Sequence, residues 1–324
     1  MTRYGFLLPT RGAVLSSGNA DALAARTHAD VIGLAERAEA LGFDSVWAGD
    51  SVTAKPRHEP LTTLAGVATV TDGVDLGTAI YLPALRHPIH LAHQTATLDQ
   101  VSGGRFVFGV GVGTGPDGER EHDHLGVPFD RRGAVLDETL DALKRLWTGE
   151  PASYEGEFVA FEDASIGFEP TRSPPVYVAS AAFDPGSGFP RAIHDRVLEH
   201  GDGWLPLGVN PDRYADGLAW LRDRLDGAGR DADAFAGAYY ADVVVREDEA
   251  TALEEARAFY DAYYPAWGEF DDAEIRARGA FGPPEHVAAV LDAYADAGAE
   301  EIVVRFVTTA NQRDQLGRFR RILD

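Results

Sequence analysis

Short apolar runs alternate with segments of helical periodicity along most of the chain. The runs predict buried strands at Tyr4–Leu8, Phe43–Ala48, both ends of residues 74–113, Val176–Ser180, 202–206, Gly237–Val245 and Glu300–Val307. Between them, apolar residues recur at the spacing of amphipathic helices. Eight strands that alternate with helices favour an α/β fold, the closed (β/α)8 or TIM barrel. An open, doubly wound parallel sheet is the alternative that this alternation leaves.

Residues 74–113 show the alternation most clearly. A helix that ends at Gly103 lies between two apolar strands, so the strands should be parallel and buried. The second strand carries Gly109, Gly111 and Gly113 at a period of two, which leaves one of its faces without side chains. Such a face either admits a flat ligand or makes room inside a narrow barrel.

Residues 149–175 interrupt the alternation. Segments such as SYEGEFVAF predict a small β excursion, inserted between the fourth helix and the next strand. No linker or change in composition marks a boundary elsewhere, so we expect one domain over residues 1–324.

The charge balance is strongly acidic. Acidic residues number 52 and basic residues 29, which gives a net charge of −23, and Lys55 and Lys144 are the only lysines. A lysine-poor, acidic surface is typical of a protein kept soluble at high salt, where repulsion between carboxylates is screened. It argues against nucleic acids and anionic membranes as partners and leaves small molecules.

Missing residue types exclude several chemistries. The chain has no cysteine, so it forms neither a disulfide nor a thiolate metal site. A Schiff-base aldolase needs a lysine inside the barrel, whereas we expect Lys55 in a loop and Lys144 on a solvent-facing helix. No signal-peptide pattern and no apolar run of bilayer length is present, so the expected location is the cytoplasm.

Two motifs suggest ligands without establishing them. GTGPDG at 113–118 matches a dinucleotide fingerprint, but we expect a polar loop to follow it rather than the helix that must bind the pyrophosphate. Histidines at 87, 90, 93, 122 and 124 do not form a convincing ligand set, and we interpret them as solvated or capping residues. No metal site is predicted, while a substrate role for His122 and His124 stays open.

Asp50 is the best-placed carboxylate. It follows the second predicted strand, at the end where α/β barrels carry their sites. Its carboxylate either binds a cofactor or caps the following loop, and the residues alone do not decide between the two.

Several segments together resemble the bacterial luciferase-like oxidoreductase family. They are LGFDSVWAGD (41–50), PLTTLAGVAT (60–69), LGTAIYLPALRHP (76–88), ATLDQVSGGRFVFGVGVG (96–113) and FGPPEHVAAVLDAYADAGAEEIVV (281–304). The resemblance implies a TIM barrel that binds a flavin or the deazaflavin coenzyme F420 at the C-terminal end of its strands. The acidic composition favours a similarity to the F420-dependent oxidoreductases of halophilic archaea.

The resemblance also implies a set of site residues. A non-prolyl cis peptide at Ala79–Ile80 would back the cofactor ring, and Asp50 would contact it. The cofactor-binding positions that follow are Asp50, Thr78, Ala79, Ile80, Val112, Gly113, Ala179, Ser180, Ala181 and Ala182. The candidate catalytic positions are Asp50, Ser51 and Thr114.

Two of these positions depart from the pattern of the family's alcohol dehydrogenases. Those enzymes carry a histidine where this chain has Ser51 and an acid where it has Thr114. Neither hydroxyl is a general base near pH 7 without a helper, so reduction is favoured over alcohol oxidation. Arginines, with Arg11, Arg86, Arg131 and Arg191 as candidates, should offset the charge of the coenzyme's phosphate and glutamate tail.

The function expected is therefore F420-dependent hydride transfer to a small organic substrate in a homodimeric enzyme. The alternatives are an FMN-dependent monooxygenase and a barrel that binds a flavin without catalysis.

Overall fold

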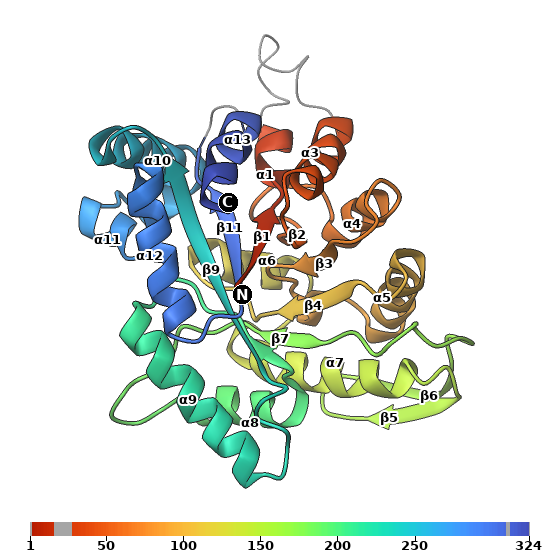
Figure 1. The fold of residues 1–324 in the computed structure, drawn as a ribbon. Helices are drawn as coiled ribbons and strands as arrows, with labels where there is room; N and C mark the ends of the chain where they lie inside the picture. Colours follow the sequence, from red (N-terminus) through yellow and green to blue (C-terminus); the bar gives the residue numbers. More distant parts are fainter. Residues whose placement is uncertain (1, 16–27, 309–311, 324) are drawn as a thin grey trace.

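Eight parallel strands close into a barrel in this computed structural model, which describes residues 2–15, 28–308 and 312–323 (Figure 1). The strands run in the order β11-β1-β2-β3-β4-β7-β8, and β9 closes the barrel by pairing with both β8 and β11. This confirms the TIM barrel and excludes the open sheet. The barrel strands are β1 (Arg3–Leu7), β2 (Ser45–Ala48), β3 (Asp75–Thr78), β4 (Phe106–Val110), β7 (Val176–Val178), β8 (Gly203–Trp204), β9 (Ala236–Val245) and β11 (Glu301–Phe306).

Helices surround the barrel on its outside (Figure 1). In the described ranges they are α1 (Thr10–Leu15), α3 (His28–Ala40), α4 (Pro60–Ala68), α5 (Pro88–Ser102), α6 (Pro116–His124), α7 (Arg132–Leu146), α8 (Arg191–His200), α9 (Pro211–Gly227), α10 (Glu249–Tyr263), α11 (Asp272–Arg276), α12 (Pro284–Asp296) and α13 (Gln312–Leu323), with short 3₁₀ turns η2 (Pro83–Leu85), η3 (Phe129–Arg131) and η4 (Pro265–Trp267). None of these helices is long and apolar enough to cross a membrane.

Helix α5 shows how local sequence sets these boundaries. Pro88 occupies its first turn, where the missing N–H needs no partner. His87 is the N-cap and accepts a hydrogen bond from the Ile89 N–H at 3.3 Å, as expected of a capping histidine. Gly103 ends the helix with φ at 71°, a left-handed conformation that glycine adopts without strain.

Apolar side chains fill the barrel interior below its C-terminal end. The inner cluster consists of Leu7, Trp47, Val107, Leu205, Ala238 and Val303, and Trp47 is fully buried. Gly77 makes room for this indole, because a Cβ at Gly77 would lie 2.1 Å from Trp47 Cε3. The barrel is therefore a packed core with its free space at the mouth.

An antiparallel hairpin follows α7, the fourth barrel helix. Its strands are β5 (Ala152–Glu155) and β6 (Ala160–Ala164), inside the stretch 149–175 for which the sequence predicts an insertion.

The region 264–282 holds an insertion that the sequence analysis did not predict. Strand β10 (Gly279–Gly282) pairs in parallel with the C-terminal half of β9, on the side where β8 pairs with the N-terminal half. Its four residues, GAFG, are too few to show a strand pattern. The short elements η4 and α11 lie between α10 and β10.

One expectation about helices is wrong. The sequence analysis predicts a polar loop after Gly113, whereas α6 begins at Pro116, inside the GTGPDG motif. Pro116 in the first turn and the acidic Asp117 and Glu119 behind it all favour a helix start.

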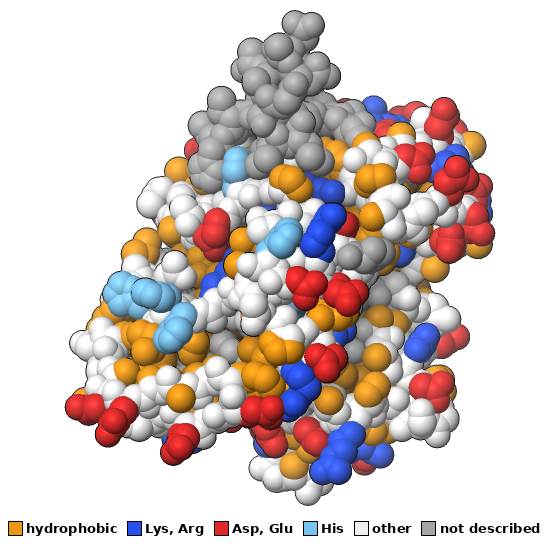
Figure 2. All heavy atoms as spheres, turned by 180° about the vertical axis from the view of Figure 1, so that it is seen from behind, with side chains coloured by type: hydrophobic (Ala, Val, Ile, Leu, Met, Phe, Trp, Pro, Cys, Tyr) orange, Lys and Arg blue, Asp and Glu red, His pale blue; other side chains and the backbone are white. Residues whose placement is uncertain are grey.

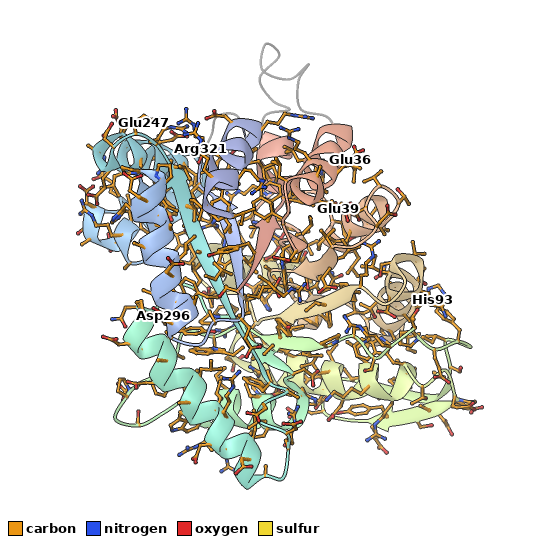
Figure 3. All side chains as sticks on the ribbon, in the orientation of Figure 1. Glu36, Glu39, His93, Glu247, Asp296 and Arg321 are labelled. Carbon is orange, nitrogen blue, oxygen red and sulfur yellow. The ribbon has the colours of Figure 1, made fainter. Side chains whose placement is uncertain are left out.

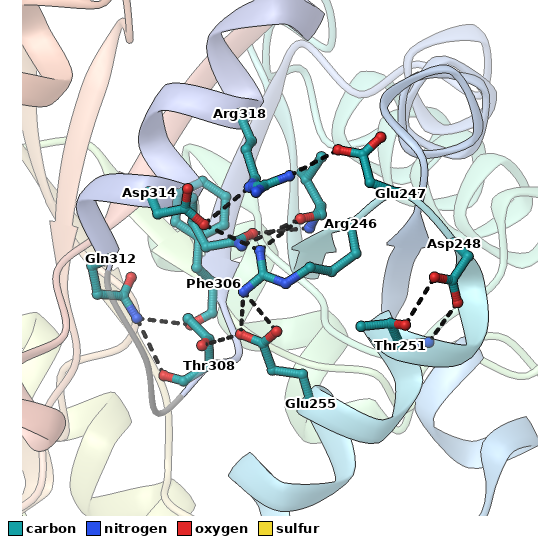
Figure 4. A network of polar contacts seen from close by, with 12 residues as sticks. Arg246, Glu247, Asp248, Thr251, Glu255, Phe306, Thr308, Gln312, Asp314 and Arg318 are labelled. Atoms are coloured by element: carbon teal, nitrogen blue, oxygen red, sulfur yellow. Dashed lines mark hydrogen bonds and ion pairs between the residues drawn. The ribbon is translucent and has the colours of Figure 1, made fainter.

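A network of charged side chains joins α10 to α13 beside the end of β11 (Figure 4). Arg246 binds Glu255 at 2.6 Å and Asp314 at 3.3 Å, and Arg318 binds Asp314 and Glu247. On the face drawn in Figure 2, acidic and basic side chains are dispersed rather than collected in one block. Glu36, Glu247 and Asp296 lie on the outer layer of the molecule (Figure 3).

Candidate active site

A cavity of about 680 Å³ lies at the C-terminal end of the barrel strands. Its size is in the range of small-molecule and cofactor sites. Most of the site residues expected from the sequence line it: Asp50, Ser51, Ala79, Ile80, Val112, Gly113, Thr114, Ala179, Ser180 and Ala181. Two expected residues do not. Thr78 is buried beneath the cavity with its hydroxyl donating to Gly109 O at 2.8 Å, and Ala182 is exposed beside it.

The peptide bond between Ala79 and Ile80 is cis, as predicted. Gly109 in β4 and Gly111 directly after it accommodate this part of the chain rather than a ligand. A Cβ at Gly109 would lie 2.0 Å from Thr78 O, and one at Gly111 would lie 2.0 Å from Ile80 Cδ1. The structure thus assigns the bare face at these two positions to close packing against Thr78 at the end of β3 and Ile80 beyond it.

Asp50 is held in a buried ion pair with Arg86. Arg86 Nη2 donates to Asp50 Oδ1 at 2.8 Å, Arg86 Nη1 donates to Oδ2, and the Leu82 N–H donates to Oδ2 at 3.0 Å. Burial raises the pKa of the Asp50 carboxyl, and Arg86 opposes that shift. The Arg86 guanidinium in turn stacks over the Tyr81 ring at 4.3 Å. Asp50 is therefore fixed in place, and Oδ1 keeps capacity to accept one more hydrogen bond from the cavity.

The Ser51 hydroxyl is engaged in hydrogen bonds that hold the loop after β2, while its expected catalytic role stays a prediction. The hydroxyl donates to Glu121 Oε1 and accepts from the Lys55 N–H, both at 2.8 Å. The same carboxylate oxygen accepts from the amides of Val52 and Thr53. Burial acts to raise the pKa of Glu121, but these hydrogen bonds outweigh it and hold the pKa below its ordinary value. Ser51 and Glu121 together fix the loop after β2.

Thr114 and His122 lie on the β4 side of the site. Thr114 is exposed at the cavity wall. His122 is fully buried rather than solvated, with Nδ1 2.8 Å from Gly118 O, and its Nε2 has no hydrogen-bond partner. His124 is exposed, and Thr53 Oγ1 lies 3.1 Å from its Nδ1. The described chain holds no group of side chains that could bind a metal ion.

Another wall of the cavity is basic and aromatic, and no pattern in the sequence predicted it. Lys55 and Arg57 reach the cavity from the loop after β2, and Arg305 reaches it from β11. Arg305 Nη1 donates to the hydroxyl of Tyr264 at 2.9 Å. The placement of Lys55 corrects the expectation that this lysine lies outside the barrel site.

Tyr264 is the tyrosine of this wall whose pKa is lowered. Burial alone would raise its pKa, but the charges of Arg305, Arg57, Lys55 and Arg11 outweigh burial and lower the pKa to about 8. The neighbouring Tyr240 and Tyr260 shift in the other direction because burial dominates there. No motif marked Tyr264, because its environment comes from four separate segments.

The four arginines suggested for the site are placed differently. Arg86 binds Asp50, and Arg11 lies against the ring of Tyr264 at 4.8 Å. Arg131 and Arg191 are bound to Glu157 and Asp195 in exposed ion pairs outside the cavity lining.

Comparison with known proteins places the chain in a family. The family model described as luciferase-like monooxygenase matches residues 2–301. The chain belongs to this family. An uncharacterised protein of Mycobacterium tuberculosis is 36% identical over 176 residues, a match that covers 53% of this chain and 58% of the relative's length. An F420-dependent glucose-6-phosphate dehydrogenase of Kineococcus radiotolerans is 32% identical over 234 residues, covering 69% of this chain and 66% of that enzyme.

Solved structures share the fold of this luciferase-like family member. An F420-dependent secondary alcohol dehydrogenase in complex with an F420–acetone adduct has a TM-score of 0.80 at 18% identity, over 99% of this chain and 98% of that chain. The monooxygenase RslO1 from Streptomyces bottropensis has a TM-score of 0.78 at 23% identity, over 99% and 97%. At these identities the likeness establishes the barrel fold alone.

Proposed function

We propose that this family member is a coenzyme F420-dependent oxidoreductase that acts on a small organic substrate, with reduction as the favoured direction. The observation that carries the proposal is the cavity of about 680 Å³, whose floor and one wall are small or apolar while its far wall is cationic. Relatives named as F420-dependent glucose-6-phosphate dehydrogenase and 5,10-methylenetetrahydromethanopterin reductase support the choice of coenzyme.

The residues present fit a planar cofactor with a negatively charged tail. One part of the cavity wall is an apolar surface of small and aliphatic side chains, against which a ring can stack. It consists of Ala79, Ile80, Val112 and Ala179. Asp50 Oδ1 can accept a hydrogen bond from a ring N–H, and its fixed orientation favours one placement of that ring. When bound, the deazaflavin supplies the hydride; the protein orients the substrate and excludes water.

Titration of the purified protein with F420 and with FMN tests the choice of coenzyme. We expect F420 to bind more tightly, followed by oxidation of reduced F420 in a panel of activated alkenes and imines. Tight FMN binding without F420 binding would instead support an FMN-dependent monooxygenase, which the family description favours. Binding without turnover across the panel would support a non-catalytic barrel.

A matched pair of variants locates the ring. Ala181 lines the cavity and the adjacent Ala182 does not, while both are exposed and tolerate a larger side chain. We expect Ala181→Trp to weaken F420 binding and Ala182→Trp to leave it unchanged. Equal affinities of the two variants would remove this wall from the cofactor site. The homodimer, the cytoplasmic location and the halophilic origin expected from the sequence remain part of this proposal.

A further inference from the structure

The cavity concentrates positive charge in a protein whose net charge is −23. Arg11, Lys55, Arg57 and Arg305, which we call the basic cluster, surround the Tyr264 side chain. The Arg11 and Arg305 guanidinium carbons and the Lys55 Nζ lie 4.8, 5.7 and 5.5 Å from the centre of its ring. Arg57 acts on the same hydroxyl through its charge.

Among the residues that the structure describes, only one cation of the basic cluster has a carboxylate partner. Arg305 is neutralised by Asp242, whose two oxygens accept from its Nε and Nη2 at 2.6 Å. By contrast, Arg11, Lys55 and Arg57 form no ion pair with any residue that the structure describes. Arg11 Nε and Nη1 are buried without a hydrogen-bond partner. Arg11, Lys55 and Arg57 are half-buried, and cations that are partly removed from water without a counter-charge cost free energy. This arrangement is expected where a ligand supplies the missing negative charge.

The carboxylates around the cavity do not cancel the cluster. Asp50 forms an ion pair with Arg86, and the Glu121 carboxylate accepts hydrogen bonds from the amides of the loop after β2. Glu274 caps the start of α11. Asp117, which lies on α6, attracts Arg11 and Lys55 through its charge, but it forms its ion pair with Arg120.

We propose that the basic cluster binds the phosphate or carboxylate group of an acidic substrate, with the Tyr264 hydroxyl as an additional hydrogen-bond donor. This inference rests on the proposed function and names the substrate class of the same cavity. Guanidinium and ammonium groups that converge from several segments match the several oxygens of such a group.

The position of the cluster favours the substrate over the coenzyme's tail. Its residues follow β1 and β2 or lie in β11, which are neighbours in the barrel. Ala179–Ala181, expected at the coenzyme, follow β7, and β7 is four strands away from β1 in either direction around the barrel. An acidic group at the cluster would therefore lie across the cavity from that wall.

Binding of inorganic phosphate to the full chain without coenzyme tests the site independently of the proposed function. Trp267 lines the cavity with Lys55 Nζ 5.2 Å from its ring, so tryptophan fluorescence should report occupancy. We expect saturable binding at constant ionic strength, weakened roughly tenfold or more by Arg57→Gln and by Lys55→Gln. Arg278→Gln is the control, because Arg278 also lines the cavity but stacks on Phe270 at 4.7 Å, outside the cluster.

Two outcomes would overturn the site. One is no phosphate binding by the wild-type protein; the other is equal binding by the wild type, Arg57→Gln and Lys55→Gln. Thermal unfolding of each variant checks that a loss of binding is not a loss of fold.

A spectroscopic arm uses Tyr264 itself, with sulfate as an anion of constant charge. The ionisation of Tyr264, which the charges of Arg305, Arg57, Lys55 and Arg11 favour, is followed by phenolate absorbance. Two carboxylates face these cations: Asp117 acts on Arg11 and Lys55, and Asp242 acts on Arg305. Its pKa should rise from about 8 when sulfate binds, and sulfate affinity should fall as the pH rises through this value. An unchanged Tyr264 titration in saturating sulfate contradicts the site.

A further comparison distinguishes an acidic group of the substrate from one of the coenzyme. It compares the affinity for FMN with that for riboflavin, and the affinity for F420 with that for its ring fragment, which lacks the phosphate and glutamates. If the cluster serves the substrate, Arg57→Gln leaves the preference for the charged form of each pair unchanged. Loss of that preference in Arg57→Gln would assign the cluster to the coenzyme tail and overturn the substrate assignment. Failure of F420 to bind at all would contradict the proposed function but leave the phosphate result standing.

Discussion

Asp50 illustrates how one side chain can be located from the sequence while its partners cannot. The sequence places it after the second strand, at the cavity end of the barrel. The structure adds Arg86, 36 positions away, which binds both carboxylate oxygens and fixes their direction. Its pairing with Arg86 suits the role of an oriented hydrogen-bond acceptor, which is the cofactor contact expected from the sequence.

Replacing Asp50 should destabilise the protein through its partner. Asp50→Asn keeps the shape but leaves the Arg86 guanidinium without a counter-charge, and we expect a loss of about 3 kcal/mol in the free energy of unfolding. Denaturant titration measures it. The double variant Asp50→Asn/Arg86→Met, in which no charge is left unpaired, should recover most of the loss. Equal stabilities of the wild type and Asp50→Asn would contradict this account.

His200 should make the stability depend on pH. Its side chain is 2% exposed at the end of α8, and neither ring nitrogen has a hydrogen-bond partner. Burial, with a smaller effect from Lys144, lowers the pKa of His200 from 6.5 to about 4. The unfolded chain thus takes up this proton at a higher pH than the folded one. Stability should be full above pH 6.5 and fall by up to about 3 kcal/mol as the pH decreases toward 4.

Denaturant titrations between pH 7 and pH 4 measure this fall against that of two variants. His200→Gln should lose less stability over the interval than the wild type. His90→Gln is the control, since His90 is exposed on α5, and it should follow the wild type. A parallel decline of wild type and His200→Gln would assign the acid sensitivity to other groups.

At the scale of elements, strands β3 and β4 depend on one another. The apolar strands and the glycines of β4 are visible in the sequence, but what fills the glycine face is not. The structure shows that Thr78 O and the Ile80 side chain occupy it. The insertion at 264–282 is the opposite case. Its elements are too short to show a pattern in the sequence, and Tyr264 gains its environment only where it meets Lys55 of the loop after β2 and Arg305 of β11.

The cost of replacing a glycine by alanine should depend on the atoms that the added Cβ contacts. Gly109→Ala would place it 2.0 Å from the backbone oxygen of Thr78, and we expect a loss of about 3 kcal/mol together with weaker coenzyme binding. Gly317→Ala is the matched control, because no heavy atom lies within 4 Å of that position in α13. It should leave stability unchanged or raise it by up to about 1 kcal/mol. Thermal unfolding compares them, and a Gly109→Ala protein as stable as the wild type would contradict the packing assigned to β4.

At the scale of the whole molecule, the dispersed acidic surface and the basic cavity are two parts of one charge distribution. Repulsion among 52 acidic residues is only partly offset by 29 basic ones, and several of the basic residues line the cavity instead of lying on the outer surface. The exterior therefore carries a larger excess of negative charge than an even distribution would give.

Salt should stabilise this molecule. Raising KCl from about 0.1 M to about 1 M shortens the Debye length from about 10 Å to about 3 Å, which weakens repulsion between surface carboxylates. We expect Tm to increase over this range, and sucrose at the same osmolality to reproduce only part of the increase. A Tm that falls with added KCl would show that the surface ion pairs contribute more than the repulsion.

The sequence by itself determined the alternation of strands and helices, because this follows from periodicity along contiguous segments. Its contiguous motifs, through the resemblance to a family, also predicted the barrel and most of one cavity wall. Only the tertiary structure decided the pairing of Asp50 with Arg86, the hydrogen bond of Ser51 to Glu121 and the gathering of Arg11, Lys55, Arg57 and Arg305 around Tyr264. The physical reason is that charge interactions depend on distance in space, and barrel closure brings together residues that are nearly the full chain length apart.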